Sequence, residues 1–67
     1  MLKLYRSKKG DLVFAKSKAA AKETFETVTD RRRRGPWAET VPKGRFETTR
    51  LACIARGAES YIYEEGE

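Results

Sequence analysis

Four consecutive arginines stand together in the stretch TDRRRRGPW, residues 29–37, and form the densest charge in this sequence. A guanidinium group donates hydrogen bonds in a fork that matches the oxygens of phosphate or carboxylate groups, so such a run suits an anionic partner. Further cations stand near turn-forming residues on either side of this run. The candidate binding residues, for nucleic-acid phosphates or for the acidic surface of a larger protein complex, are Lys8, Lys9, Arg31, Arg32, Arg33, Arg34, Lys43 and Arg45.

Two aromatic residues are candidates for contact with the same partner. Trp37, the only tryptophan, follows the arginines directly, and Tyr5 lies in the basic N-terminal half. If exposed, either ring could stack on a base or anchor a protein interface. A tryptophan in so small a domain is more often part of the core, and this alternative is favoured for Trp37.

The residues that usually carry catalysis or hold metals are scarce. There is no histidine, and the single cysteine, Cys53, lies in the apolar stretch LACIA, where burial would keep it inert. Glu23, Glu26 and Asp30 have a spacing that could hold a metal, but pairing with Lys22 and the arginines explains them better. We therefore expect no catalytic residue, no metal, no cofactor and no enzymatic activity.

The charge is unevenly distributed. The net charge is +5 over 67 residues; residues 1–34 hold eleven Lys and Arg against four Asp and Glu, whereas residues 35–67 hold four against six. This asymmetry indicates an anionic partner at one end of the molecule. The sequence has no apolar run long enough for a membrane span and no signal peptide, and its lone cysteine fits a reducing compartment, so we expect a cytoplasmic protein.

Residue patterns predict a β-hairpin at the N-terminus. Leu2, Leu4 and Arg6 alternate with Lys3 and Tyr5, which is typical of a strand, and residues 11–16 form a short apolar return strand. Gly10 suits the turn between them.

The rest of the chain predicts an α+β fold in a single domain, residues 1–67. A main helix is expected over about 17–34, with Ser17 as N-cap and the arginines near its C-terminus, followed by a loop over 35–45. Residues of about 48–56 form a short helix, capped by Thr48 and ending before Gly57, or a strand; the helix is favoured because its apolar residues share one face. A final strand is expected over about 60–64.

The apolar residues available for a core are few, so a domain of this length has limited stability by itself, and homo-oligomerisation or docking stays open. The expected core, besides alanines, is Leu2, Leu4, Leu12, Val13, Phe14, Phe25, Val28, Trp37, Val41, Phe46, Leu51, Ile54, Tyr61, Ile62 and Tyr63.

Together these features predict a small non-enzymatic basic binding protein. Its arginine cluster would contact the phosphate backbone of DNA or RNA with little sequence specificity. The alternative is a phage- or plasmid-type inhibitor or adaptor of a host nucleic-acid enzyme, similar in role to anti-CRISPR or anti-restriction proteins. It would dock through Arg31–Arg34 and Trp37 on an acidic partner surface.

Overall fold

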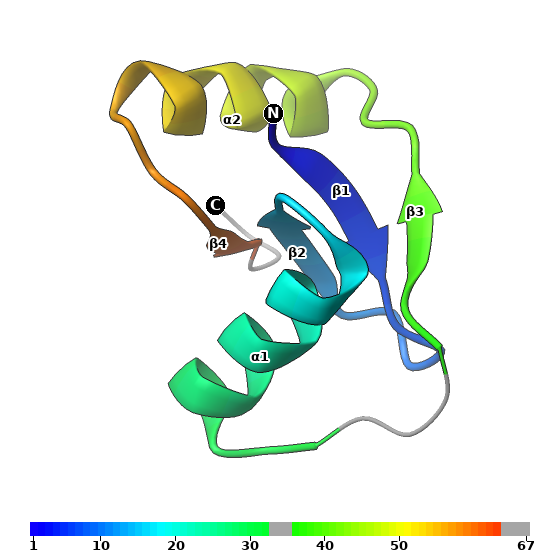
Figure 1. The fold of residues 1–67 in the computed structure, drawn as a ribbon. Coiled ribbons are helices and arrows are strands. Elements are labelled where there is room, and N and C mark those ends of the chain that lie inside the picture. The colour runs from blue at the N-terminus through cyan, green and yellow to red at the C-terminus, as the bar shows by residue number, and fades with distance from the viewer. Residues whose placement is uncertain (33–35, 64–67) are drawn as a thin grey trace.

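The computed structural model describes residues 1–32 and 36–63, which form a four-stranded antiparallel sheet and two helices (Figure 1). The chain order is β1 (Lys3–Arg6), β2 (Leu12–Ala15), α1 (Lys18–Thr29), β3 (Ala38–Thr40), α2 (Arg45–Ala55) and β4 (Tyr61–Tyr63). The strands are ordered β3-β1-β2-β4, so the N-terminal hairpin forms the centre of the sheet. The predicted α+β class, the hairpin, both helices and the final strand are confirmed.

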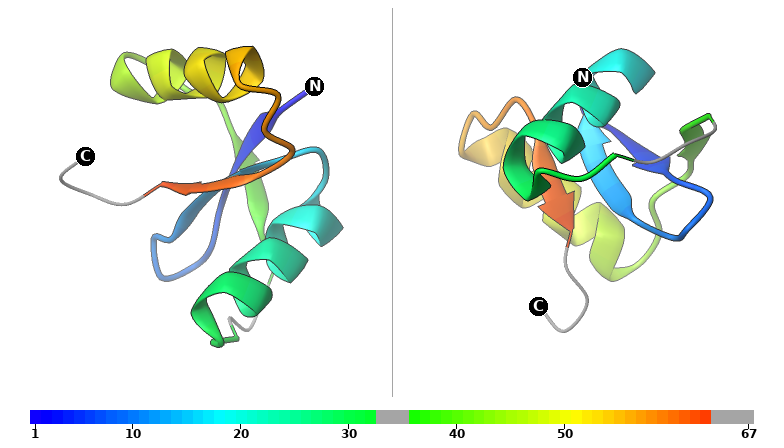
Figure 2. Two further views of the ribbon diagram at one scale, coloured as in Figure 1. Left: turned by 90° about the vertical axis from the view of Figure 1, so that its left-hand side faces the viewer. Right: turned by 90° about the horizontal axis from the view of Figure 1, so that it is seen from below.

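One helix covers each face of the sheet (Figure 2). On the first face, Phe25 of α1 packs in one apolar cluster with Tyr5, Val13, Ala15 and Trp37. Here the Phe25 and Trp37 rings lie 5.4 Å apart between centroids.

On the second face, α2 packs against the side chains that alternate with these. Cys53 of α2 shares a cluster with Leu4, Phe14 and Tyr63, and Phe46 packs against it. Because both faces are covered, both sets of alternating residues in the strands are buried, which explains why β2 reads as a continuous apolar run. Cys53 is fully buried, as expected from its apolar surroundings.

Helix α1 is shorter than the predicted 17–34. Its start follows the prediction, because Ser17 Oγ accepts a hydrogen bond from the Ala20 amide at 3.1 Å. Its end differs: Asp30 adopts a left-handed conformation with φ of 56°, and its amide donates to Glu26 O. Arg31 and Arg32 therefore lie beyond the helix, whose last turn contains no cation, so the predicted helix end at about residue 34 is wrong.

Residues 35–45 were expected to be irregular, but three of them form the edge strand β3. Its register on β1 places Thr40 opposite Leu4, Glu39 opposite Tyr5 and Ala38 opposite Arg6. A three-residue strand carries too short an alternation to be recognised from sequence. The pairing with β1 supplies its backbone hydrogen bonds.

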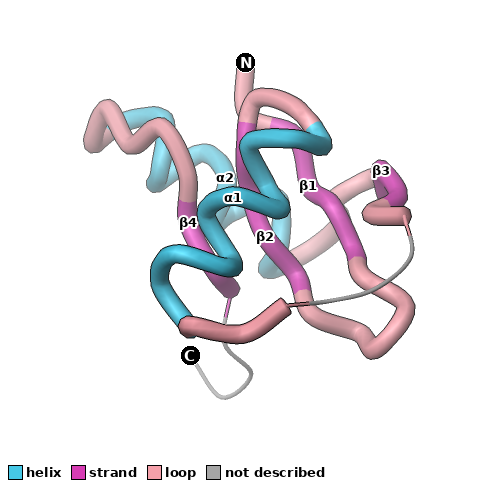
Figure 3. The backbone as a smooth tube through the Cα atoms, turned by 60° about the horizontal axis from the view of Figure 1, so that its bottom comes forward, coloured by secondary structure: helices cyan, strands magenta, loops and turns pink. Residues whose placement is uncertain are grey.

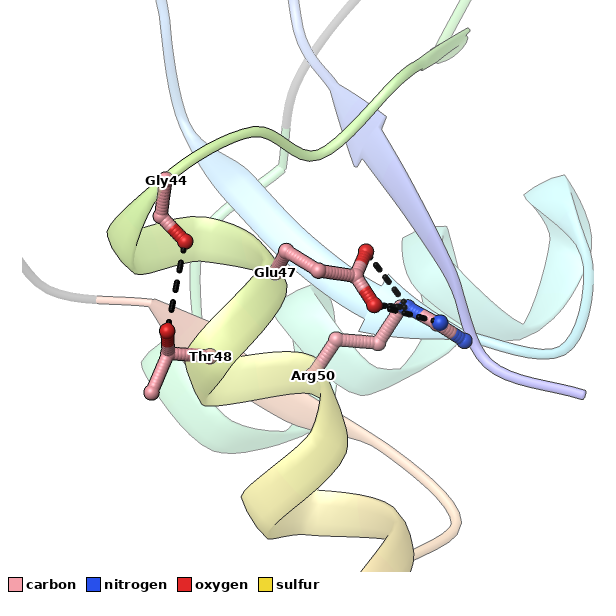
Figure 4. A network of polar contacts seen from close by, with 4 residues as sticks. All are labelled: Gly44, Glu47, Thr48 and Arg50. Atoms are coloured by element: carbon pink, nitrogen blue, oxygen red, sulfur yellow. Dashed lines mark hydrogen bonds and ion pairs between the residues drawn. The ribbon is translucent and has the colours of Figure 1, made fainter.

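Helix α2 confirms the favoured helix over the strand for residues 48–56, although its boundaries differ. It begins at Arg45, and Thr48 is not its cap: Thr48 Oγ1 donates back to Gly44 O at 3.4 Å (Figure 4). Its end is as predicted, because Gly57 has a φ of 74° and donates to Ile54 O, while the Ala58 amide donates to Cys53 O. These two bonds form a Schellman motif.

Four residues predicted in the core are exposed instead: Val28, Val41, Leu51 and Ile54. In α2, Cys53 and Phe46 face the sheet, so the stripe with Leu51 and Ile54 is rotated away from it. Val41 lies in the connection between β3 and α2, and Val28 lies on the outer side of α1.

Phe25 and Val28 lie one turn apart on α1 and test this packing directly. Phe25→Ala should lower the free energy of unfolding by about 3–5 kcal/mol, because Phe25 is buried against Trp37 and leaves a cavity. Val28→Ala should change it by less than about 0.5 kcal/mol, because Val28 is exposed. Urea unfolding followed by far-UV circular dichroism measures both, and equal losses would contradict the assignment of faces.

Candidate nucleic-acid interface

The turn between β1 and β2 is built around Ser7, a buried polar residue. Ser7 Oγ accepts hydrogen bonds from the amides of Lys9 (3.2 Å) and Asp11 (3.0 Å), and donates to Asp11 Oδ2 at 2.7 Å. Gly10, with a φ of 93°, donates its amide to Ser7 O at 3.1 Å. These bonds hold residues 7–11 in one conformation and leave Lys8 and Lys9 exposed at the tip.

The C-terminal end of α1 lies at the same end of the molecule as this turn (Figures 1 and 3). Arg31 is exposed and, with Asp11 and Tyr63, lines a hollow of about 340 Å³ between the end of α1 and the base of the turn. Arg31 thus shares a hollow with Asp11, which closes the turn that carries Lys8 and Lys9.

Of the four arginines, Arg31 and Arg32 are among the described residues, and carboxylates lie close to both. Arg31 and Arg32 share a second hollow with Glu23, Glu26 and Asp30. These carboxylates therefore lie close to the two arginines, as expected. Arg33 and Arg34 lie outside the described residues, so the predicted contribution of all four arginines stays a prediction.

A third hollow, of about 360 Å³, lies on the α2 face of the sheet beside the same turn. Its lining combines Leu4, Leu12 and Phe46 with the cations Arg6 and Lys43, and is completed by Gly10, Thr40 and Val41. No carboxylate of the described residues lines it, whereas the two hollows that contain Arg31 each have at least one. This hollow is called the α2-face groove below.

Sequence reasoning did not select Arg6, although a signal was present. Arg6 continues the alternation of Leu2 and Leu4, so it lies on the same face of β1 beyond the apolar floor and next to the turn. Of the two later cations that were selected, Lys43 lines the α2-face groove with Arg6. Arg45 begins α2, is exposed and does not line it.

The two aromatic candidates are in the core. Tyr5 and Trp37 each keep only 4% of their surface exposed and belong to the cluster under α1. The core interpretation of Trp37 is confirmed. Neither ring is accessible in this structure for base stacking or as an interface anchor, because each is packed between the sheet and α1.

Several cations away from the turn lie in ion pairs. Lys3 lies 3.8 Å from Glu39 across the β1–β3 edge, and Lys16 lies 3.6 Å from Glu59. In α2, Arg50 Nε lies 3.0 Å from both carboxylate oxygens of Glu47 (Figure 4). The Arg50 guanidinium lowers the pKa of the Glu47 carboxyl below its ordinary value of 4.5, chiefly by hydrogen bonding.

Within residues 1–32 and 36–63 there is no group of three or more Cys, Asp or Glu side chains placed to hold a metal ion. The same residues contain no helix with the length and apolar character needed to cross a membrane. Comparison with protein-family models, with curated proteins and with solved structures finds no match. The candidate interface therefore rests on its own geometry.

Ser7→Ala tests whether the turn positions Lys8 and Lys9. The free energy of unfolding should fall by about 1–3 kcal/mol, because two amides and one carboxylate lose their shared partner. Amide hydrogen exchange measured by NMR should accelerate at Lys9 and Asp11 and stay unchanged at Ala20, which is bonded to Ser17. Unchanged exchange at Lys9 and Asp11 would contradict the role of Ser7.

Glu47→Gln should lower the thermal midpoint at neutral pH, because the ion pair with Arg50 is lost. Since the folded-state pKa of Glu47 is lowered, its contribution is present above about pH 4.5 and is lost as the pH falls through the folded-state pKa. The difference in midpoint between wild type and variant should therefore shrink below about pH 4.5. Thermal unfolding across this range measures it, and a constant difference would contradict the pairing.

Proposed function

We propose that this chain is a non-enzymatic basic protein that binds the phosphate backbone of nucleic acid with little sequence specificity. The surface that does so is the hairpin end, defined by Arg6, Lys8, Lys9, Arg31 and Lys43. The observation that carries the proposal is that Arg6 and Lys43 line one hollow with Gly10 of the turn, while Arg31 lines another with Asp11 at its base.

The chemistry of these side chains suits phosphate. Lys8 and Lys9 are exposed point charges on an ordered turn, and arginine can donate two parallel hydrogen bonds to one phosphate group. Each phosphate that is neutralised releases condensed counterions, so four to six such contacts would give about micromolar affinity that falls with salt. The burial of Trp37 and Tyr5 leaves the backbone contacts to supply this affinity.

A second function is favoured by a different observation. Leu51 and Ile54 are 54% and 44% exposed on α2, and exposed apolar side chains on one helix suit contact with a protein. An inhibitor or adaptor that docks on an acidic partner is therefore the alternative proposal. Trp37 would not be its anchor, because that ring is buried.

Paired lysine variants test the first proposal. Lys8→Gln/Lys9→Gln should weaken binding of a labelled oligonucleotide and flatten the slope of log affinity against log salt, by roughly 0.9 for each lysine that contacts a duplex phosphate. Fluorescence anisotropy over a series of salt concentrations measures both quantities.

The matched control is Lys18→Gln/Lys22→Gln, which removes the same charge from the first half of α1. It should leave the slope nearly unchanged. Equal effects of the two double variants would show that net charge alone drives binding, and absence of binding at roughly 50 mM salt would remove the proposal. A complex captured from cell extract that survives nuclease and is lost in Leu51→Glu would support the alternative instead.

A further inference from the structure

We propose that the α2-face groove binds one unpaired base of a single strand, with Arg6 and Lys43 on the adjacent phosphates, so that the protein prefers single-stranded to duplex nucleic acid. This inference rests on the proposed function, because it names the form of nucleic acid that the hairpin end takes.

The floor of the groove is apolar and well supported. Leu4 is buried, Leu12 and Phe46 are partly buried, and all three line the groove while packing in the core cluster of this face. The Phe46 ring is held edge-on against Tyr63, with centroids 4.8 Å apart and planes at 63°. The groove thus offers an apolar surface that includes an aromatic ring. Its volume of about 360 Å³ lies within the usual range of ligand sites.

Among residues 1–32 and 36–63, the charged side chains on the rim of the groove are all cations. Arg6 reaches it from the end of β1 and Lys43 from the β3–α2 connection. A ligand that fits must therefore combine an apolar part with a nearby anion. This excludes a purely apolar ligand, which would leave the two cations facing it without a partner.

An unpaired nucleotide has this combination. Its base presents two apolar faces, and the phosphate is attached to the same sugar. In a duplex the base faces are stacked on one another, so a duplex could meet the cations on the rim but could not occupy the floor. The groove therefore complements a single strand better than a double one.

The position of the groove continues the surface already proposed. Gly10 belongs both to the groove lining and to the turn that carries Lys8 and Lys9. A strand with one base in the groove would pass directly from the Arg6 and Lys43 rim to the lysines at the tip. An acidic peptide would match the rim, but this cationic track beyond the groove favours a repeating polyanion.

The experiment compares two exposed valines. Val41 lines the groove and is 73% exposed, whereas Val28 lies on α1 outside the groove and is 69% exposed. Val41→Glu and Val28→Glu make the same change in net charge at sites where the fold does not depend on the side chain. The probes are a labelled oligothymidylate, an abasic oligonucleotide of equal length and a duplex.

Wild type and Val28→Glu should bind oligothymidylate about 5- to 150-fold more tightly than the abasic strand, the range expected for stacking of one base. Val41→Glu should lose this difference, because a carboxylate enters the groove. In NMR spectra of the wild type, oligothymidylate should shift the Val41 methyl and Phe46 ring signals, and the abasic strand should not.

The experiment distinguishes the failure of this inference from the failure of the proposed function. Equal affinity of wild type for thymidylate, abasic strand and duplex overturns the groove but leaves backbone binding standing. No binding of any of the three removes both proposals. Tighter binding of a peptide of alternating glutamate and leucine than of oligothymidylate, lost in Val41→Glu, would overturn the inference in favour of a protein ligand.

Discussion

Burial of both faces of the β1–β2 hairpin is the constraint on which the rest of this structure depends. A hairpin of two four-residue strands has little stability in isolation, and six of the eight residues in these strands are apolar or aromatic. Helix α1 covers the face of Tyr5 and Val13, and α2 covers the face of Leu4 and Phe14. Each helix thus removes from water a set of residues that the other cannot reach.

This arrangement also determines where charge can lie. With both faces of the central strands covered, the cations of these strands, Lys3 and Arg6, lie at the ends of β1. Lys8 and Lys9 occupy the turn, Arg6 ends β1, and Arg31 follows the C-cap of α1. Because α1 ends near the turn, Arg31 lies at the same end of the molecule as this turn.

The two helices differ in how many buried residues they contribute to the core. Helix α1 places Ala21 and Phe25 in it, whereas Cys53 is the one fully buried residue of α2. Helix α2 therefore leaves Leu51 and Ile54 exposed and stands far enough over the sheet to leave the groove between Phe46 and Leu12. The same loose coverage provides the apolar floor for a ligand and the exposed apolar residues that favour a protein contact.

The sequence by itself determined the elements with strong local signals. These are the hairpin with Gly10 in its turn, the start of α1 at Ser17, the end of α2 at Gly57 and the final strand, each specified by alternation or by capping chemistry within a few residues. The tertiary structure alone decided that Ala38–Thr40 pairs with β1, that Val41 and Leu51 are exposed, and that Arg6 and Lys43 share one groove. The physical reason is that a local pattern specifies which residues share a face, but which face is covered, and by what, depends on contacts between segments far apart in the chain.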